Sequence, residues 1–183
     1  MIDHELTLNN IKSELLTLYV NASEGYKSFN TYFHIFQESV FKFFDIKNIH
    51  FFIVQDRLLK PTNPSFNKEL FRNGIEWAKF EYYFEETNIV STPEPFINSE
   101  PFSQLDQMMV IRKNNNEPFG VIFFESTYFW HSFANSTYIN EFLVVVSKLF
   151  LTIYDSIEIR LNEIHYRKLY NMTDLFHSTM DTD

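Results

Sequence analysis

The C-terminal part of the chain constrains the fold most, because residues 137–183 contain neither glycine nor proline. Apolar residues recur there at helical spacing and form a wide face, made by Ile139, Phe142, Val146, Phe150, Ile153 and Ile157. A narrower stripe continues at the spacing of a coiled coil, with one longer step near His165 that resembles a stutter. We therefore expect one long helix that lies across a sheet and then leaves the domain.

Two amphipathic helices and one strand are predicted upstream of residue 60. The first helix is indicated by a single apolar stripe, made by Leu8, Ile11, Leu15 and Leu18. A second helical pattern runs from Phe29 to Phe43 and is broken by residues 45–48. The run Ile49–Gln55 is apolar, β-branched and aromatic, which is typical of a central strand.

A β-hairpin gives the clearest strand signal in the chain. Gln107–Arg112 and Pro118–Glu125 are apolar runs, and the Asn-rich segment 113–117 joins them. Two adjacent antiparallel strands are therefore expected. With the helices on either side, they predict an α+β fold.

The remaining segments give weaker signals. A turn is expected at Pro61, Asn63 and Pro64, and residues 66–84 show a loosely helical spacing that Gly74 weakens. Residues 91–102 hold three prolines and no period, so a loop is predicted. A second loop, rich in aromatic residues, is expected at residues 128–133, before a helix N-cap at Ser136 or Thr137.

Composition excludes several functions. The 183 residues fit one domain, and three glycines are too few for a Gly-rich phosphate loop. Without cysteine there is no thiolate nucleophile, disulfide or Cys-ligated metal. We also expect no cofactor, no metal and no catalytic residues in this chain. A net charge of -9 disfavours nucleic acid as a ligand. No apolar run is long enough for a membrane span and no signal peptide opens the sequence, so a cytoplasmic protein is expected.

The order of these elements resembles the GAF domain family, which is related to PAS domains and consists of sensory modules with an antiparallel sheet flanked by helices. The hairpin carries the resemblance: Asn114–Asn116 matches the polar turn, Gly120 the glycine of the second strand, and residues 129–137 the loop before the last helix. The resemblance implies a GAF-like sensor domain at residues 22–160. Residues 1–21 would be an N-terminal dimerisation helix, and residues 161–183 a coiled-coil linker toward a domain beyond this sequence.

The resemblance also implies a small-molecule pocket of unknown specificity. Trp77, Tyr82 and Tyr83 precede the segment that covers the ligand in GAF domains, so they are candidate wall residues. An anionic ligand would be repelled by the acidic middle of the chain unless Lys79 or Arg112 opposed that charge, and His131 lies in the aromatic loop. These five residues are the predicted ligand-binding set, and core packing is the competing interpretation for Trp77, Tyr82 and Tyr83.

The tail from Tyr170 looks like the linker of bacterial tandem-GAF proteins, including diguanylate cyclases that carry a GGDEF domain and make cyclic di-GMP. We therefore expect a regulatory domain that signals to a downstream domain of the same chain. The alternative is the effector-binding domain of a transcription regulator. A parallel homodimer is expected through one set of apolar residues: Leu8, Ile11, Leu15, Ile157, Leu161, Leu169, Met172 and Phe176. The competing interpretation is that residues 161–183 fold back onto the domain or fray.

Overall fold

The computed structural model describes residues 3–23, 28–63, 65–97, 99–113 and 115–180. Within these ranges a few side chains, among them those of Leu161 and residues 173–180, are not described. Pro64 and Asn114 are not described at all. The helices are α1 (His4–Ser23), α2 (Phe29–Phe44), α3 (Lys68–Asn73), α4 (Ala78–Glu81), the 3-10 helix η1 (Tyr82–Phe84), α5 (Glu94–Ile97), α6 (Tyr128–Ala134) and α7 (Ile139–Met180). The strands are β1 (Ile49–Gln55), β2 (Leu58–Pro61), β3 (Ile75–Glu76), β4 (Ile89–Ser91), β5 (Gln107–Arg112) and β6 (Pro118–Phe124).

These strands form one six-stranded sheet in the order β3-β2-β1-β6-β5-β4, and each neighbouring pair is antiparallel. β1 and β6 occupy the centre of the sheet, which confirms the predicted central strand. The antiparallel pairing of β5 with β6 confirms the predicted hairpin. The α+β class is likewise confirmed.

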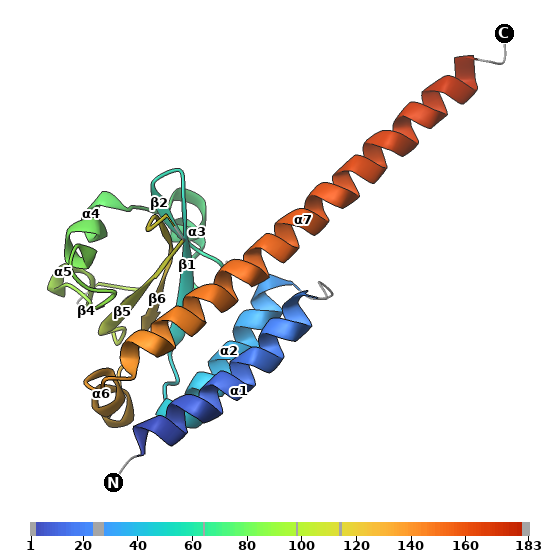
Figure 1. The fold of residues 1–183 in the computed structure, drawn as a ribbon. Coiled ribbons are helices and arrows are strands. Elements are labelled where there is room, and N and C mark those ends of the chain that lie inside the picture. Colours follow the sequence, from blue (N-terminus) through green and yellow to red (C-terminus); the bar gives the residue numbers. More distant parts are fainter. Residues whose placement is uncertain (1–2, 24–27, 64, 98, 114, 181–183) are drawn as a thin grey trace.

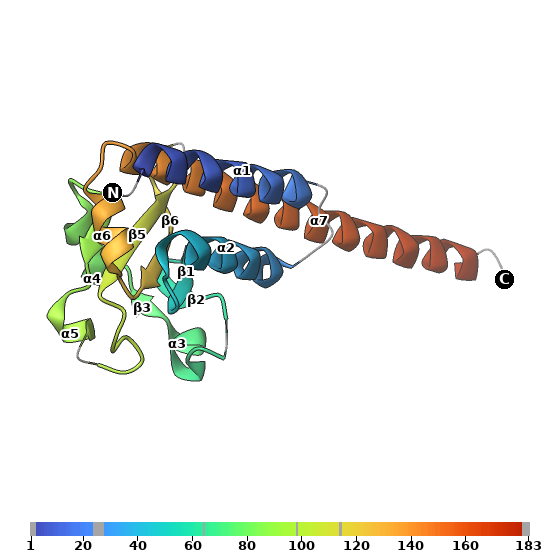
Figure 2. The same ribbon diagram turned by 90° about the horizontal axis from the view of Figure 1, so that it is seen from below.

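Helices α1, α2 and α7 cover one face of the sheet, which we call the helical face (Figures 1 and 2). Its core includes Phe51 of β1, Ile122 of β6 and Phe150 of α7. Lys12 of α1 forms an ion pair with Glu141 of α7 and thereby links these two helices. The apolar stripe predicted for the first helix faces inward, where α1 packs against α2 and α7.

The opposite face, which we call the loop face, is covered by α3, α4, η1 and α5 (Figure 2). A second core lies there and includes Phe52 of β1, Phe80 of α4 and Phe123 of β6. Successive strand residues alternate between the two cores, as Met108 and Met109 do in β5. Because both faces are covered, the central strands are apolar at nearly every position.

Gly120 in β6 lies where the backbone of β1 comes very close. A Cβ atom added there would lie 2.5 Å from the Phe52 carbonyl oxygen and 2.5 Å from the Phe51 ring. Glycine is therefore required by this close approach, which gives a physical reason for the glycine that the family resemblance singled out.

Three segments differ from the sequence predictions. The sequence predicts no strand at β2, where only Pro61 is assigned to a turn, but Asp56 and Arg57 both adopt positive φ, 52° and 61°, and close a tight hairpin between β1 and β2. Residues 66–84 do not form one helix, because Gly74 at φ 68° ends α3 and the chain enters β3.

The third difference is α6, where an aromatic loop was expected. Thr127 caps this helix by accepting a hydrogen bond from the Trp130 N–H, and Trp130 and Phe133 are buried beneath it. Aromatic residues are poor helix formers, so the cap and the burial of these two side chains outweigh propensity here. Residues 91–102 are mostly irregular, as predicted, apart from short α5 and the end of β4.

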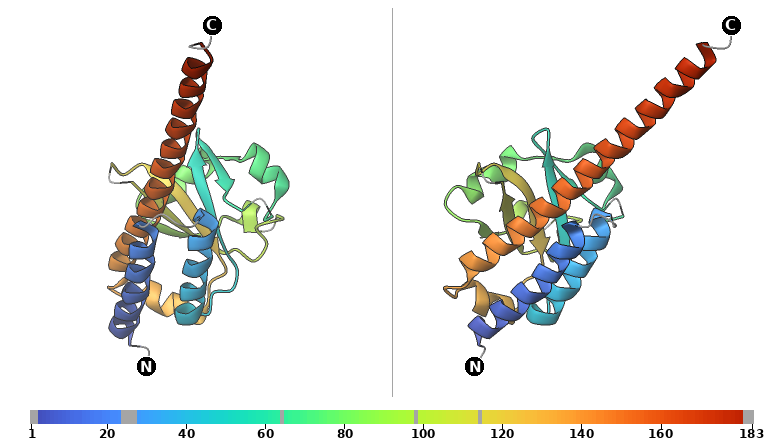
Figure 3. Two further views of the ribbon diagram at one scale, coloured as in Figure 1. Left: turned by 90° about the vertical axis from the view of Figure 1, so that its right-hand side faces the viewer. Right: turned by 45° about the vertical axis from the view of Figure 1, so that its right-hand side comes forward.

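Helix α7 is 42 residues long, which corresponds to about 63 Å. Its first half crosses the helical face as far as Ile157, and its second half projects away from the domain, as Figures 1 and 3 show. The described residues of this projecting segment, 162–172, are exposed. Over residues 162–172, the structure thus does not show the fold-back alternative. Within the described residues, no helix combines the length and apolar character needed to cross a membrane.

Candidate functional site

The five predicted ligand-binding residues do not line a common pocket. Trp77 is buried, 6% exposed, and stacks on Phe84 with ring centroids 5.9 Å apart. Tyr82 and Tyr83 lie next to it in η1 but face solvent, with 75% and 40% of their surface exposed. Trp77 thus packs as a core residue, and the two tyrosines stand on an open surface.

Arg112 and His131 have structural partners at separate places. The Arg112 guanidinium donates to the Phe84 carbonyl oxygen at 2.7 Å and to the Asn88 side chain at 3.0 Å, which ties η1 to β5. His131 lies on α6, where its Nε2 is 2.9 Å from the Ser126 hydroxyl. Asp106 accepts hydrogen bonds from the Ser126 backbone N–H and hydroxyl, so this group connects the start of β5 to α6.

The space between the sheet and the α3–α5 layer is occupied by aromatic rings. Neighbouring rings in this cluster have centroids 4.5–6.1 Å apart, and its members are Phe52, Phe66, Phe80, Phe96, Phe102 and Phe123. Such spacing is that of a packed core. A cavity of about 340 Å³ lies at the edge of this aromatic cluster, beside Leu70 and Phe102.

His50 of β1 lies at another edge of this aromatic cluster. Its ring centroid is 4.1 Å from that of Phe66, and burial lowers the pKa of His50 from 6.5 to about 4. The imidazole is therefore neutral at pH 7.

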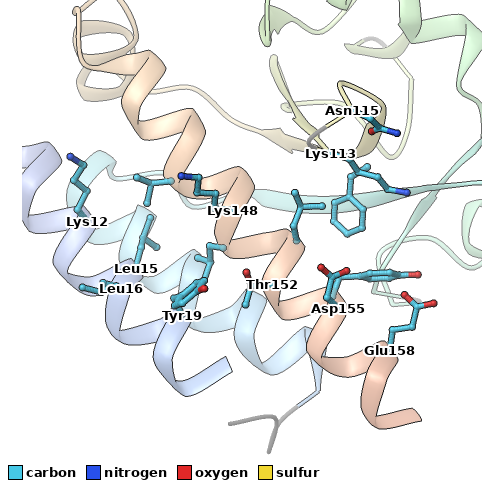
Figure 4. A pocket seen from close by; sticks show the side chains of 15 residues that line it. Lys12, Leu15, Leu16, Tyr19, Lys113, Asn115, Lys148, Thr152, Asp155 and Glu158 are labelled. Atoms are coloured by element: carbon cyan, nitrogen blue, oxygen red, sulfur yellow. The ribbon is translucent and has the colours of Figure 1, made fainter. Parts of the chain in front are cut away.

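A groove of about 800 Å³ lies over helix α7 (Figure 4). Helix α1 forms one wall with Leu16 and Tyr19, and the β5–β6 turn forms the other with Lys113 and Asn115. The floor is α7 itself. None of the five predicted ligand-binding residues lines it.

The groove combines apolar surface with charges of both signs. Lys148 and Asp155 lie on the floor, and Glu158 follows at the end that leads into the projecting segment. Tyr154 packs against Phe119, with ring centroids 5.0 Å apart. Partial burial, together with Glu158 and Asp155, raises the pKa of Tyr154, so its phenol stays protonated at neutral pH.

Sequence reasoning missed this groove because it assigned only one apolar face to each helix. Two signals were nevertheless present. Leu16 and Tyr19 lie off the inward stripe of α1, and Lys148 interrupts the apolar run 142–154 of α7.

The residues predicted to form a dimer interface lie in three different environments. Leu8, Ile11 and Leu15 are 1–2% exposed and pack in the protein's own core, and the outer face of α1 carries Leu16, Tyr19 and Val20. Ile157 is half-buried against the same core.

Farther along α7, Leu169 and Met172 are exposed on the projecting segment, at 47% and 54%. The side chains of Leu161 and Phe176 lie outside the described residues.

Among the described residues, no group of three His, Asp or Glu side chains is arranged to hold a metal ion. Comparison with known proteins adds no assignment, since the chain matches no family model and no curated protein sequence.

Proposed function

We propose that this chain is a GAF-like regulatory domain of a multidomain signalling protein, which controls a downstream GGDEF diguanylate cyclase through helix α7. Two features support the proposal. The antiparallel sheet is flanked by helices, and the β5–β6 hairpin with Gly120 precedes the last long helix. The compartment consistent with this role is the cytoplasm.

The observation that carries the proposal is the continuity of α7. Its first half contributes Phe142, Val146 and Phe150 to the core, while its second half projects without a break to Met180. A displacement of the domain half therefore moves the projecting half as one rigid element. A regulatory domain needs such an element to reach a neighbouring domain.

The projecting segment is proposed to pair in parallel with that of a second copy. Met172 and Leu169 expose apolar surface there, and burying such side chains is worth about 1.5–3 kcal/mol each before association costs. Parallel pairing would place the two downstream domains side by side. The longer step near His165 offers two neighbouring registers.

Helical phase provides the test. We would join the full chain to a GGDEF catalytic domain and insert alanine-rich segments of one heptad or half a heptad at the junction. Cyclase activity should survive the whole heptad and fall with the half heptad, because only the former keeps the helical phase. Activity independent of the insert would contradict control through α7.

A pair of variants tests the parallel dimer itself. Leu169→Glu combined with Met172→Glu should lower cyclase activity of this fusion by at least about tenfold, since charges would be buried in the pair. Arg167→Glu, on the polar side of the same segment, is the matched control and should leave activity unchanged. An equal loss of cyclase activity in the double variant and in Arg167→Glu would attribute the effect to net charge and contradict pairing through the apolar stripe.

A further inference from the structure

Five residues form one stripe along the outer surface of α7: Val144, Lys148, Leu151, Asp155 and Ile159. At 3.6 residues per turn they fall within an arc of about 80°. Val144 and Ile159 are 52% and 60% exposed, and Lys148 and Asp155 are also exposed. The stripe therefore alternates apolar and charged groups, and its centre, Leu151, is partly buried against the core while the other four side chains are exposed.

The two charges in the stripe lack partners within the described part of the chain. Lys12, which lines the same groove, forms an ion pair with Glu141, whereas Lys148 and Asp155 have none among the described residues. They cannot pair with each other, because seven residues separate them by about 10 Å along the helix. Charges of opposite sign from outside the chain would complement both.

The order of the stripe is symmetric about a point between Leu151 and Thr152. Val144 and Ile159 lie equally far from this point, on opposite sides, and so do Lys148 and Asp155. When a second α7 is laid antiparallel over this point, each Val144 faces an Ile159 of the other helix. Each Lys148 likewise faces an Asp155 of the other helix. A parallel second helix would instead place Lys148 against Lys148 and Asp155 against Asp155, which is unfavourable.

We propose that the groove over α7 is the docking surface for a second copy of this chain, with the two α7 helices antiparallel and crossing between Leu151 and Thr152. The walls fit this occupant: Leu16 and Tyr19 of α1 offer apolar contact on one side, and the β5–β6 turn closes the other (Figure 4). Such an interface is isologous, because the same surface serves both copies.

This pairing sends the two projecting segments in opposite directions. It therefore excludes the parallel pairing of those segments within the same dimer, and it holds the attached domains apart. The separation of the attached domains matters for regulation only if the proposed function holds, whereas the antiparallel contact itself does not rest on that function.

Charge reversal tests the contact in the unmodified chain by sedimentation equilibrium. Lys148→Glu or Asp155→Lys alone should weaken dimerisation by at least about tenfold, because each creates two like-charge contacts in the symmetric dimer. The double variant should restore the wild-type dissociation constant. Lys168→Glu with Glu163→Lys, on the projecting segment, is the matched control and should have no effect. A double variant as weak as the single ones would overturn the antiparallel arrangement.

Cross-linking gives an independent result, because the natural chain has no cysteine. After mild oxidation, a mixture of Val144→Cys and Ile159→Cys proteins should form a mixed disulfide dimer, and neither variant alone should cross-link efficiently. Self-linking of Val144→Cys, or a wild-type monomer at about 100 μM, would overturn the proposal. Met172→Cys reports on the parallel pairing separately. If Met172→Cys links to itself and the mixed disulfide does not form, only the antiparallel contact is contradicted. If the mixed disulfide forms and Met172→Cys does not link to itself, only the parallel pairing is contradicted.

Discussion

At the residue scale, Gly120 sets the closest approach between β1 and β6. Gly120→Ala should lower the free energy of unfolding by about 1–3 kcal/mol, because the added methyl meets the Phe52 carbonyl oxygen at 2.5 Å. Urea denaturation followed by far-UV circular dichroism measures this. Asn116→Gly is the control in the same hairpin: Asn116 has φ 66°, which glycine adopts freely, so stability should be unchanged or slightly higher. An unaltered midpoint for Gly120→Ala would contradict the close approach.

His50 should make the protein less stable in mild acid. Its folded-state pKa of about 4 lies below the ordinary 6.5, so the unfolded chain binds the proton first as pH falls. The stability that neutral His50 contributes is full above pH 6.5 and decreases progressively toward pH 4. His50→Phe should flatten the difference in urea midpoint between pH 7.5 and 5, compared with wild type. Identical pH profiles for wild type and His50→Phe would contradict this prediction.

At the scale of elements, the sequence predicts those whose apolar period is long and uninterrupted. α1, α2, β1, the β5–β6 hairpin and α7 all match their predicted ranges closely. The misses share a cause, because short elements depend on conformations and contacts that periodicity does not express. Two successive residues with positive φ create the β1–β2 hairpin, and a single threonine cap together with buried rings creates α6.

The two halves of α7 should differ in what they contribute to stability. Glu163→Pro should reduce the helical circular dichroism signal but leave the urea midpoint of the domain unchanged, since the described residues around it are exposed. Ile153→Ala is the contrasting variant in the first half. Its side chain is 1% exposed, so its loss should cost about 2–5 kcal/mol. A comparable destabilisation by Glu163→Pro would indicate that the second half packs against the domain.

At the scale of the whole molecule, the site was harder to predict than the fold. A resemblance places Trp77 and Arg112 near a pocket, but their roles depend on which neighbours the sheet brings to them. Phe84 contacts both, by ring stacking and through its carbonyl oxygen, and turns them into structural residues. The groove over α7 needs α1 and the β5–β6 turn, which are about 100 residues apart in sequence, and no local pattern encodes that meeting.

The two cores should unfold together, because they share the strands of one sheet. Met108 and Phe123 pack on the loop face, while Met109 and Ile122 pack on the helical face, so losing either layer exposes the other side of β5 and β6. The two tryptophans report on one layer each: Trp77 on the loop face and Trp130 on the helical face. In Trp77→Phe and in Trp130→Phe, the fluorescence transition of the remaining tryptophan in urea should coincide with the far-UV circular dichroism transition. The Glu163→Pro background serves as the control, since it removes the signal of the projecting helix from the comparison. A Trp77 transition at lower urea than the dichroism transition would mean that the α3–α5 layer unfolds separately.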